Sequence, residues 1–128
     1  AATPYTFTLT NAGSEHTRRI IFRFVSQGVN GFTNPKIENL TTAQDFQSTT
    51  DGATASHILS VDASPGLGKA QLSTNAGTSW ADDTAALTLG SLQGVLMELQ
   101  PGANSMRYTD GGTPNLKLQV WYLPAYRD

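Results

Sequence analysis

Apolar and polar residues alternate along much of this 128-residue chain, and a period of two residues limits the folds it can adopt. The clearest case is TRRIIFRFV, residues 17–25, in which Ile20, Phe22 and Phe24 fall on one face of an extended strand. Few segments show a helical period, while Gly, Pro, Asn and Asp recur between the alternating runs. The pattern therefore predicts an all-β protein.

The same alternation predicts about nine short strands, too many for one flat sheet in a domain of this size, so they should pack as two sheets. The predicted strands are residues 5–9, 20–25, 34–41, 44–49, 56–63, 69–74, 95–99, 104–109 and 116–123. Residues 82–89, DDTAALTL, fit either a short helical turn or a loop. We predict a single antiparallel β-sandwich of jelly-roll or related type over residues 1–128, excised from or appended to a longer protein.

Composition argues against several classes of function. The chain has no cysteine, which removes disulfides, thiolate nucleophiles and cysteine-bound metals. Its formal net charge is −2, and no basic run is longer than Arg18-Arg19, so we expect no nucleic-acid binding. No apolar stretch approaches the roughly 20 residues needed to span a bilayer, so we expect no membrane insertion.

Residues suited to catalysis are sparse. His16 lies in the polar loop GSEHTRR, His57 lies at the start of a predicted strand, and no nucleophile elbow accompanies either of them. Asp82 and Asp83 are adjacent, so they would point in opposite directions along an extended chain. We predict no enzyme, no catalytic residue, no cofactor and no metal site. A calcium ion in the SWADDT loop and a glycosidase acting through Glu98 are the alternatives.

Two tryptophans are candidates for binding. Trp80 lies in the polar loop GTSWADD, where it could stack against a sugar ring beside Asp82 and Asp83, or cap one end of the core. Trp121 lies on the predicted outer face of the last strand and could serve likewise. For Trp121 we favour packing against another protein chain or domain, because tryptophan is common among interface anchors.

The corner LQPGANSMRY is predicted to be structural. Pro101 and Gly102 suit the second and third places of a type II turn, because proline fixes a negative φ and glycine accepts a positive one. Asn104 can then hydrogen-bond to the local backbone. The corner should set Leu99 and Met106 into one core, with no chemistry of its own.

Four segments in a fixed order carry a resemblance to a known family: NPKIENLTT, then ILSVD with a glycine-bearing turn and KAQL, then LQPGANSMRYT, and finally LKLQVWYLPAYRD. In this order they resemble the C-terminal domain of siphophage distal tail proteins. The resemblance covers residues 20–127 loosely, and the order of the segments is its strongest part. No counterpart of that family's ring-forming N-terminal half is present in this sequence. Residues 74–94 are longer than the family's compact hairpin, which leaves a related tail-fibre or minor tail domain as an alternative.

The resemblance implies a galectin-like β-sandwich on the outside of a tail ring, at the tail tip or baseplate of a virion. Its function would be structural and non-catalytic, with partners in the tail tube, the tail tip and the receptor-binding protein. Trp121, Tyr126 and Arg127 are then the expected interface residues. Some relatives look like carbohydrate-binding modules that hold a phage to its host, which leaves a dedicated cell-wall glycan-binding module using Trp80 as the alternative.

Overall fold

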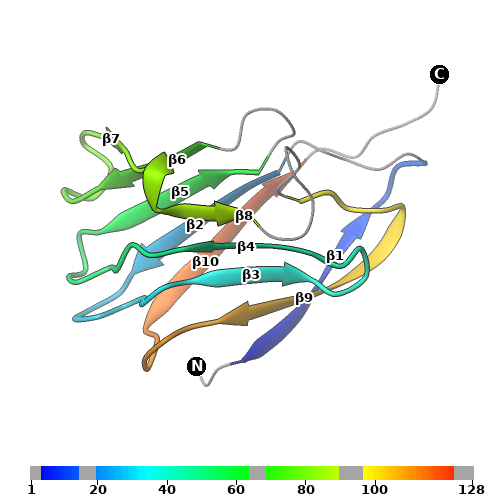
Figure 1. Cartoon of the computed structure of the whole chain (residues 1–128), viewed down its shortest axis with the longest axis horizontal. Helices are drawn as coiled ribbons and strands as arrows, with labels where there is room; N and C mark the ends of the chain where they lie inside the picture. Colours follow the sequence, from blue (N-terminus) through cyan, green and yellow to red (C-terminus); the bar gives the residue numbers. More distant parts are fainter. Residues whose placement is uncertain (1–3, 15–19, 64–68, 90–96, 123–128) are drawn as a thin grey trace.

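The chain folds as a β-sandwich, as the alternation predicts. In the computed structural model, which describes residues 4–14, 20–63, 69–89 and 97–122, ten strands form two five-stranded antiparallel sheets (Figure 1). The fold class expected from the sequence is therefore confirmed.

The strands are divided evenly between two sheets, here called sheet I and sheet II. Sheet I has the order β1 (Tyr5–Asn11), β9 (Gly102–Thr109), β3 (Lys36–Asn39), β4 (Gln44–Ser48) and β8 (Leu87–Leu89). Sheet II has the order β10 (Leu116–Tyr122), β2 (Ile20–Ser26), β5 (Ile58–Asp62), β6 (Lys69–Ser73) and β7 (Ala81–Asp82). Successive strands often change sheet, so each sheet contains strands from both halves of the chain.

The core lies between the two sheets and is built from the inner positions of the alternating strands. Ile20, Phe22 and Phe24 have no exposed surface, and the rings of Phe22 on sheet II and Phe46 on sheet I lie 5.3 Å apart between centroids. Burying a large apolar side chain contributes roughly 1.5–3 kcal/mol, so this face of β2 is a major source of stability. The predicted inward and outward faces of residues 20–25 are confirmed.

The prediction of a strand over residues 95–99 is wrong for Met97 and Glu98, which lie outside any strand; Val95 lies outside the described residues. Met97 is nevertheless fully buried. The backbone here bonds to buried amide side chains: the Glu98 N–H donates to Gln44 Oε1 at 2.9 Å, and Asn39 Nδ2 donates to the Glu98 carbonyl at 2.9 Å. These side chains replace a neighbouring strand as the partner of the buried backbone.

The corner between residues 99 and 105 is organised by one buried side chain. Gly102 has a φ of 90°, which favours glycine, and Asn104 is fully buried. Asn104 Nδ2 donates to the carbonyls of Gln100 and Gly102 at 3.0 and 3.1 Å, while its Oδ1 accepts the Gln100 N–H at 3.0 Å. A second buried amide, Asn39, donates to the same Oδ1 at 3.3 Å. The corner is therefore held by side-chain to backbone bonds.

Residues 82–89 cross from sheet II to sheet I. A 3₁₀ turn, η1 (Thr84–Ala86), leads into β8, which pairs with β4. The Asp83 N–H donates to the Ala70 carbonyl at 2.8 Å, and Thr84 Oγ1 accepts the Ala70 N–H at 3.1 Å. Of the two alternatives for DDTAALTL, the helical turn is present at Thr84–Ala86, while Asp82 ends β7 and Leu87–Leu89 form β8.

Candidate functional site

The outer face of sheet II carries a stack of three side chains. The guanidinium of Arg23 lies between the two indole rings of the chain, with its Cζ 5.2 Å from the Trp80 ring centroid and 5.1 Å from that of Trp121. Both distances are within the range of cation–π attraction, worth about 0.5–1 kcal/mol for each exposed pair. We call Trp80, Arg23 and Trp121 the tryptophan–arginine stack. It places all of the chain's tryptophan at one site.

Strand register explains how two members of the stack meet. The alternation of β2 directs Phe22 and Phe24 inward, so Arg23 points outward. Strand β10 pairs with β2 with Gln119 opposite Arg23 and Trp121 opposite Ile21. Residues diagonal to each other across an antiparallel pair are close enough for long and aromatic side chains to touch.

Trp80 reaches the same face from the β6–β7 connection, at the far side of the sheet. The connection is held by Asn75, whose Oδ1 accepts the Ser79 N–H at 2.9 Å and whose Nδ2 donates to Ser79 Oγ at 2.8 Å. The Gly77 N–H donates to Ser73 Oγ at 2.8 Å. These bonds position the residue immediately before β7 over the outer face, where Trp80 is half-buried.

A row of polar side chains crosses sheet II beside the stack. Pairwise register places one outward-facing residue on each of the five strands side by side, in the order Gln119, Arg23, Ser60, Gln71 and Asp82. The row offers amide, hydroxyl, guanidinium and carboxylate groups, which include both hydrogen-bond donors and acceptors. A flat face with aromatic rings and mixed donors and acceptors is suited to a ligand with an apolar ring face and several hydroxyls.

Arg23 has no carboxylate partner among the described residues. Its Nε is buried and has no hydrogen-bond partner there, although buried N–H groups are usually paired. Arg107, on the outer face of sheet I, forms two bonds to Glu38 instead, Nε to Oε1 at 2.9 Å and Nη2 to Oε2 at 3.0 Å. The two arginines thus differ in whether their donors are already used.

The structure separates the two aspartates predicted beside Trp80. Asp82 pairs with Gln71 and shares its outward face, and its Oδ1 accepts the Thr84 hydroxyl at 2.6 Å and the Thr84 N–H at 3.2 Å. The Thr84 hydroxyl and N–H hold the pKa of Asp82 below its ordinary value, so it stays charged. Asp83 instead accepts the hydroxyl of Thr50, because the backbone leaves β7 at this residue and turns into η1.

Arg23 was missed by sequence reasoning, and Trp121 was assigned to a protein interface. Alternation already directed both outward, but only the pairing of β10 with β2, and the path of the Trp80 loop, brings the three side chains together. Tyr126 and Arg127, the other predicted interface residues, lie outside the described residues.

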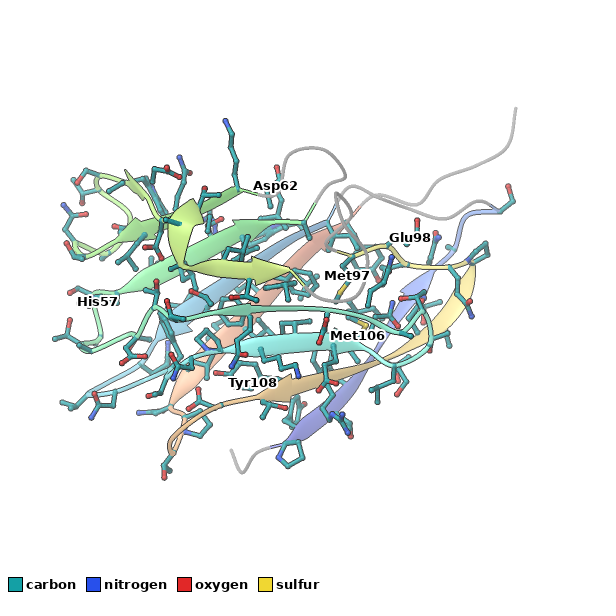
Figure 2. All side chains as sticks on the ribbon, in the orientation of Figure 1. His57, Asp62, Met97, Glu98, Met106 and Tyr108 are labelled. Atoms are coloured by element: carbon teal, nitrogen blue, oxygen red, sulfur yellow. The ribbon has the colours of Figure 1, made fainter. Side chains whose placement is uncertain are left out.

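The other candidate residues have structural partners. His57 precedes β5, with its Nδ1 2.9 Å from Thr54 Oγ1, and it lies far from Glu98 in Figure 2. His16 lies outside the described residues. Tyr108, also labelled in Figure 2, is buried and donates its hydroxyl to Asp110; this burial and the Asp110 carboxylate raise its pKa.

Asp110 also accepts backbone N–H groups, from Thr33 at 3.0 Å and from Gly112 at 2.8 Å, which marks it as a turn residue. Within residues 4–14, 20–63, 69–89 and 97–122, no three histidine, aspartate or glutamate side chains are grouped as they would be around a metal ion. In those same ranges no helix has the length and apolar character to cross a membrane.

No model of a known protein family matches this chain, and no curated protein is significantly similar to it in sequence. Assignment of a function therefore depends on the geometry of the site and on the order of the four sequence segments.

Proposed function

We propose that this domain is a non-catalytic binding domain that attaches to carbohydrate through the outer face of sheet II. The observation that carries the proposal is the tryptophan–arginine stack, in which Arg23 holds Trp80 and Trp121 on one face. An indole ring covers the apolar face of a pyranose, and the adjacent polar row supplies partners for its hydroxyls. The proposed site keeps Trp80 and Asp82 of the predicted set and adds Arg23 and Trp121. It omits Asp83, which bonds to Thr50 instead.

Preorganisation supports this assignment. Trp121 is 48% exposed, so its ring can meet a ligand, yet its contact with Arg23 limits its freedom before binding. A side chain that is already ordered loses less conformational entropy when a ligand binds. An exposed tryptophan fixed in this way therefore loses less conformational entropy when it binds a ligand than one whose side chain rotates freely.

The biological setting we propose is a phage tail tip or baseplate, where the domain would help to hold the virion to a cell-wall glycan of its host. The support for this setting is the order of the four segments resembling siphophage distal tail proteins, together with a β-sandwich fold. Sandwiches serve many functions, so the fold by itself is weak support. Neighbouring tail proteins are the proposed protein partners.

The experiment is binding of a fluorescent fusion of this chain to intact bacterial cells and to purified cell-wall polysaccharide, with free sugars as competitors. We expect retention that a sugar competes away, and a loss of at least about tenfold in affinity for Trp121→Ala and for Trp80→Ala. Leu40→Ala is the matched control, because Leu40 is 44% exposed on the β3–β4 turn of the other sheet. Equal retention of all three variants, or no competition by any sugar, would refute the proposal.

A further inference from the structure

The sandwich has one long edge strand without the usual protection against pairing. Within the described residues β1 pairs only with β9, and its sequence YTFTLTN has no charge and no proline. The other edge strands are short or charged: β7 has two residues, β8 has three, and β10 carries Lys117. Short length and lysine are common means of keeping an edge from pairing with another chain, and β1 has neither.

In β1, the backbone N–H and carbonyl groups of every second residue point toward the free edge of the sheet. Ser105 is opposite Thr8 in the β1–β9 pair, but its N–H donates to Thr41 Oγ1 at 2.9 Å and its carbonyl accepts the Leu40 N–H at 2.8 Å. Both groups of Ser105 therefore point away from β1, which makes Thr8–Ser105 a non-hydrogen-bonded pair. The N–H and carbonyl of Thr8 must then point to the open edge, as must those of Thr6. The Thr10 carbonyl also points away from β9, but it already accepts the Tyr122 hydroxyl of β10 at 3.0 Å, so the open part of the edge is centred on Thr6 and Thr8.

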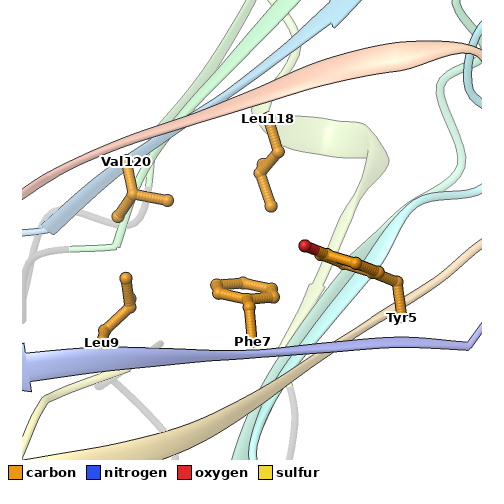
Figure 3. A pocket seen from close by; sticks show the side chains of 5 residues that line it. All are labelled: Tyr5, Phe7, Leu9, Leu118 and Val120. Carbon is orange, nitrogen blue, oxygen red and sulfur yellow. The ribbon is translucent and has the colours of Figure 1, made fainter. Parts of the chain in front are cut away.

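An apolar groove lies beside this edge. Figure 3 shows Tyr5, Phe7 and Leu9 of β1 pointing toward Leu118 and Val120 of β10. These five side chains line a groove with a volume of about 340 Å³. Tyr5 is 50% exposed and stacks on Phe7, with ring centroids 5.9 Å apart. The groove lies between the edge strands of the two sheets, so a strand added to β1 would cover it.

We propose that β1 pairs antiparallel with β1 of a second copy of this chain, joining two copies of sheet I into one ten-stranded sheet. The strand is its own complement. With Phe7 opposite Phe7 of the second copy, Thr6 lies opposite Thr8 and Tyr5 opposite Leu9. The outward-directed backbone groups of Thr6 and Thr8 then exchange hydrogen bonds, threonine pairs with threonine, and apolar residues pair over the groove.

A second copy fits better than a different protein because no charge on β1 selects another partner. The pairing is isologous, with a two-fold axis perpendicular to the joined sheet. Both copies of sheet II then lie on the same side of that sheet. As a consequence that rests on the proposed function, the dimer would present two glycan-binding faces in one direction and gain avidity on a surface.

The test is sedimentation velocity of the full chain from dilute to concentrated solution, without glycan. We expect the mass to rise toward twice the 13.6 kDa of one chain. Thr6→Lys/Thr8→Lys places lysine opposite lysine and should weaken the dimer at least about tenfold. Thr8→Pro should also weaken it, because it removes an outward N–H without disturbing the pairing with β9.

Thr88→Lys/Thr113→Lys is the control, since it adds the same charge at exposed residues outside β1 and should leave the dimer intact. Circular dichroism checks that each variant is folded. If Thr6→Lys/Thr8→Lys does not fold, the mass of Thr8→Pro decides whether β1 forms the dimer. A wild type that stays monomeric, or that pairs only with an added peptide strand, would overturn the proposal. So would a dimer that survives both edge variants or is lost in the control. Trp121→Ala should remain dimeric, which separates this proposal from glycan binding.

Discussion

The outer faces of the two sheets each carry an arginine on an inner strand, but in contrasting surroundings. On sheet I, Arg107 pairs with Glu38 through two hydrogen bonds, and Lys36 lies 3.6 Å from Asp45. On sheet II, Arg23 lies between two indole rings and has no carboxylate partner among the described residues. The charges of sheet I are matched within the face itself.

On the proposed function, this difference separates a face whose charges pair with one another from the face that would meet a ligand. Arg107 has two of its five N–H donors bonded to Glu38, whereas no N–H of Arg23 bonds to a carboxylate among the described residues. Exposed indole surface on sheet II also has no counterpart among the outward residues described on sheet I. The proposal therefore places recognition on sheet II and gives sheet I a solvated, supporting role.

Among substitutions on the two faces, Arg23→Met should have the largest effect on stability and on glycan affinity. The substitution removes both cation–π contacts, so we expect a loss of about 1–2 kcal/mol in the free energy of unfolding. Glycan affinity should also fall by at least about tenfold, because both rings lose their support. Urea unfolding and the cell-wall binding assay measure the two effects. Unchanged stability and unchanged affinity together would show that the stack has no energetic role.

Trp80→Leu should have a smaller effect on stability. It keeps an apolar side chain over the sheet but removes one of the two aromatic contacts of Arg23, so we expect a loss of about 0.5–1 kcal/mol. The measurement is urea unfolding of Trp80→Leu, Arg23→Met and the double variant. Additive losses in this cycle would contradict a direct contact between the two side chains.

Arg107→Met is the matched control on sheet I. Arg107 is 37% exposed and its ion pair is screened by water, so we expect a smaller loss in the free energy of unfolding than for Arg23→Met. Glycan affinity should not change. A drop in affinity similar to that of Arg23→Met would show that the binding face had been assigned to the wrong sheet.

The smallest effect should be the pH dependence of Glu38→Gln. The hydrogen bond from Arg107 lowers the pKa of Glu38 below its ordinary value of 4.5. A lowered carboxyl pKa stabilises the folded state above the unfolded value, and this stabilisation is lost as pH falls through the folded value. The stability difference between wild type and Glu38→Gln, below about 1 kcal/mol, should be present at neutral pH and shrink below pH 4.5. A difference that grows in acid would contradict the ion pair.

Most of the fold could be predicted from the sequence because a half-buried strand has an unmistakable period. Ile20, Phe22 and Phe24 were placed correctly in the core by alternation alone. The strand prediction from alternation was wrong at Glu98, where the backbone hydrogen-bonds to side chains and not to a neighbouring strand. Nothing local in the sequence identifies Gln44 and Asn39 as those partners, since both lie more than fifty residues away.

The candidate site was predicted only in part. Trp80 and Trp121 were recognised as unusual because each is a large ring at a polar or outward position. Their meeting over Arg23 depends on the register of β10 against β2, which a single sequence does not specify. Asp83 was included because it neighbours Asp82, and the backbone turns it toward Thr50 instead.

The most direct test of the binding face is a two-dimensional nitrogen–proton NMR titration with solubilised cell-wall glycan. The chain has two tryptophans, so the spectrum contains two indole N–H signals, both from the stack. We predict that both signals and the Arg23 Nε–H signal shift with one common dissociation constant, while the Arg107 Nε–H signal does not. Shifts confined to sheet I, or indole signals that stay unchanged while glycan binds, would contradict the account.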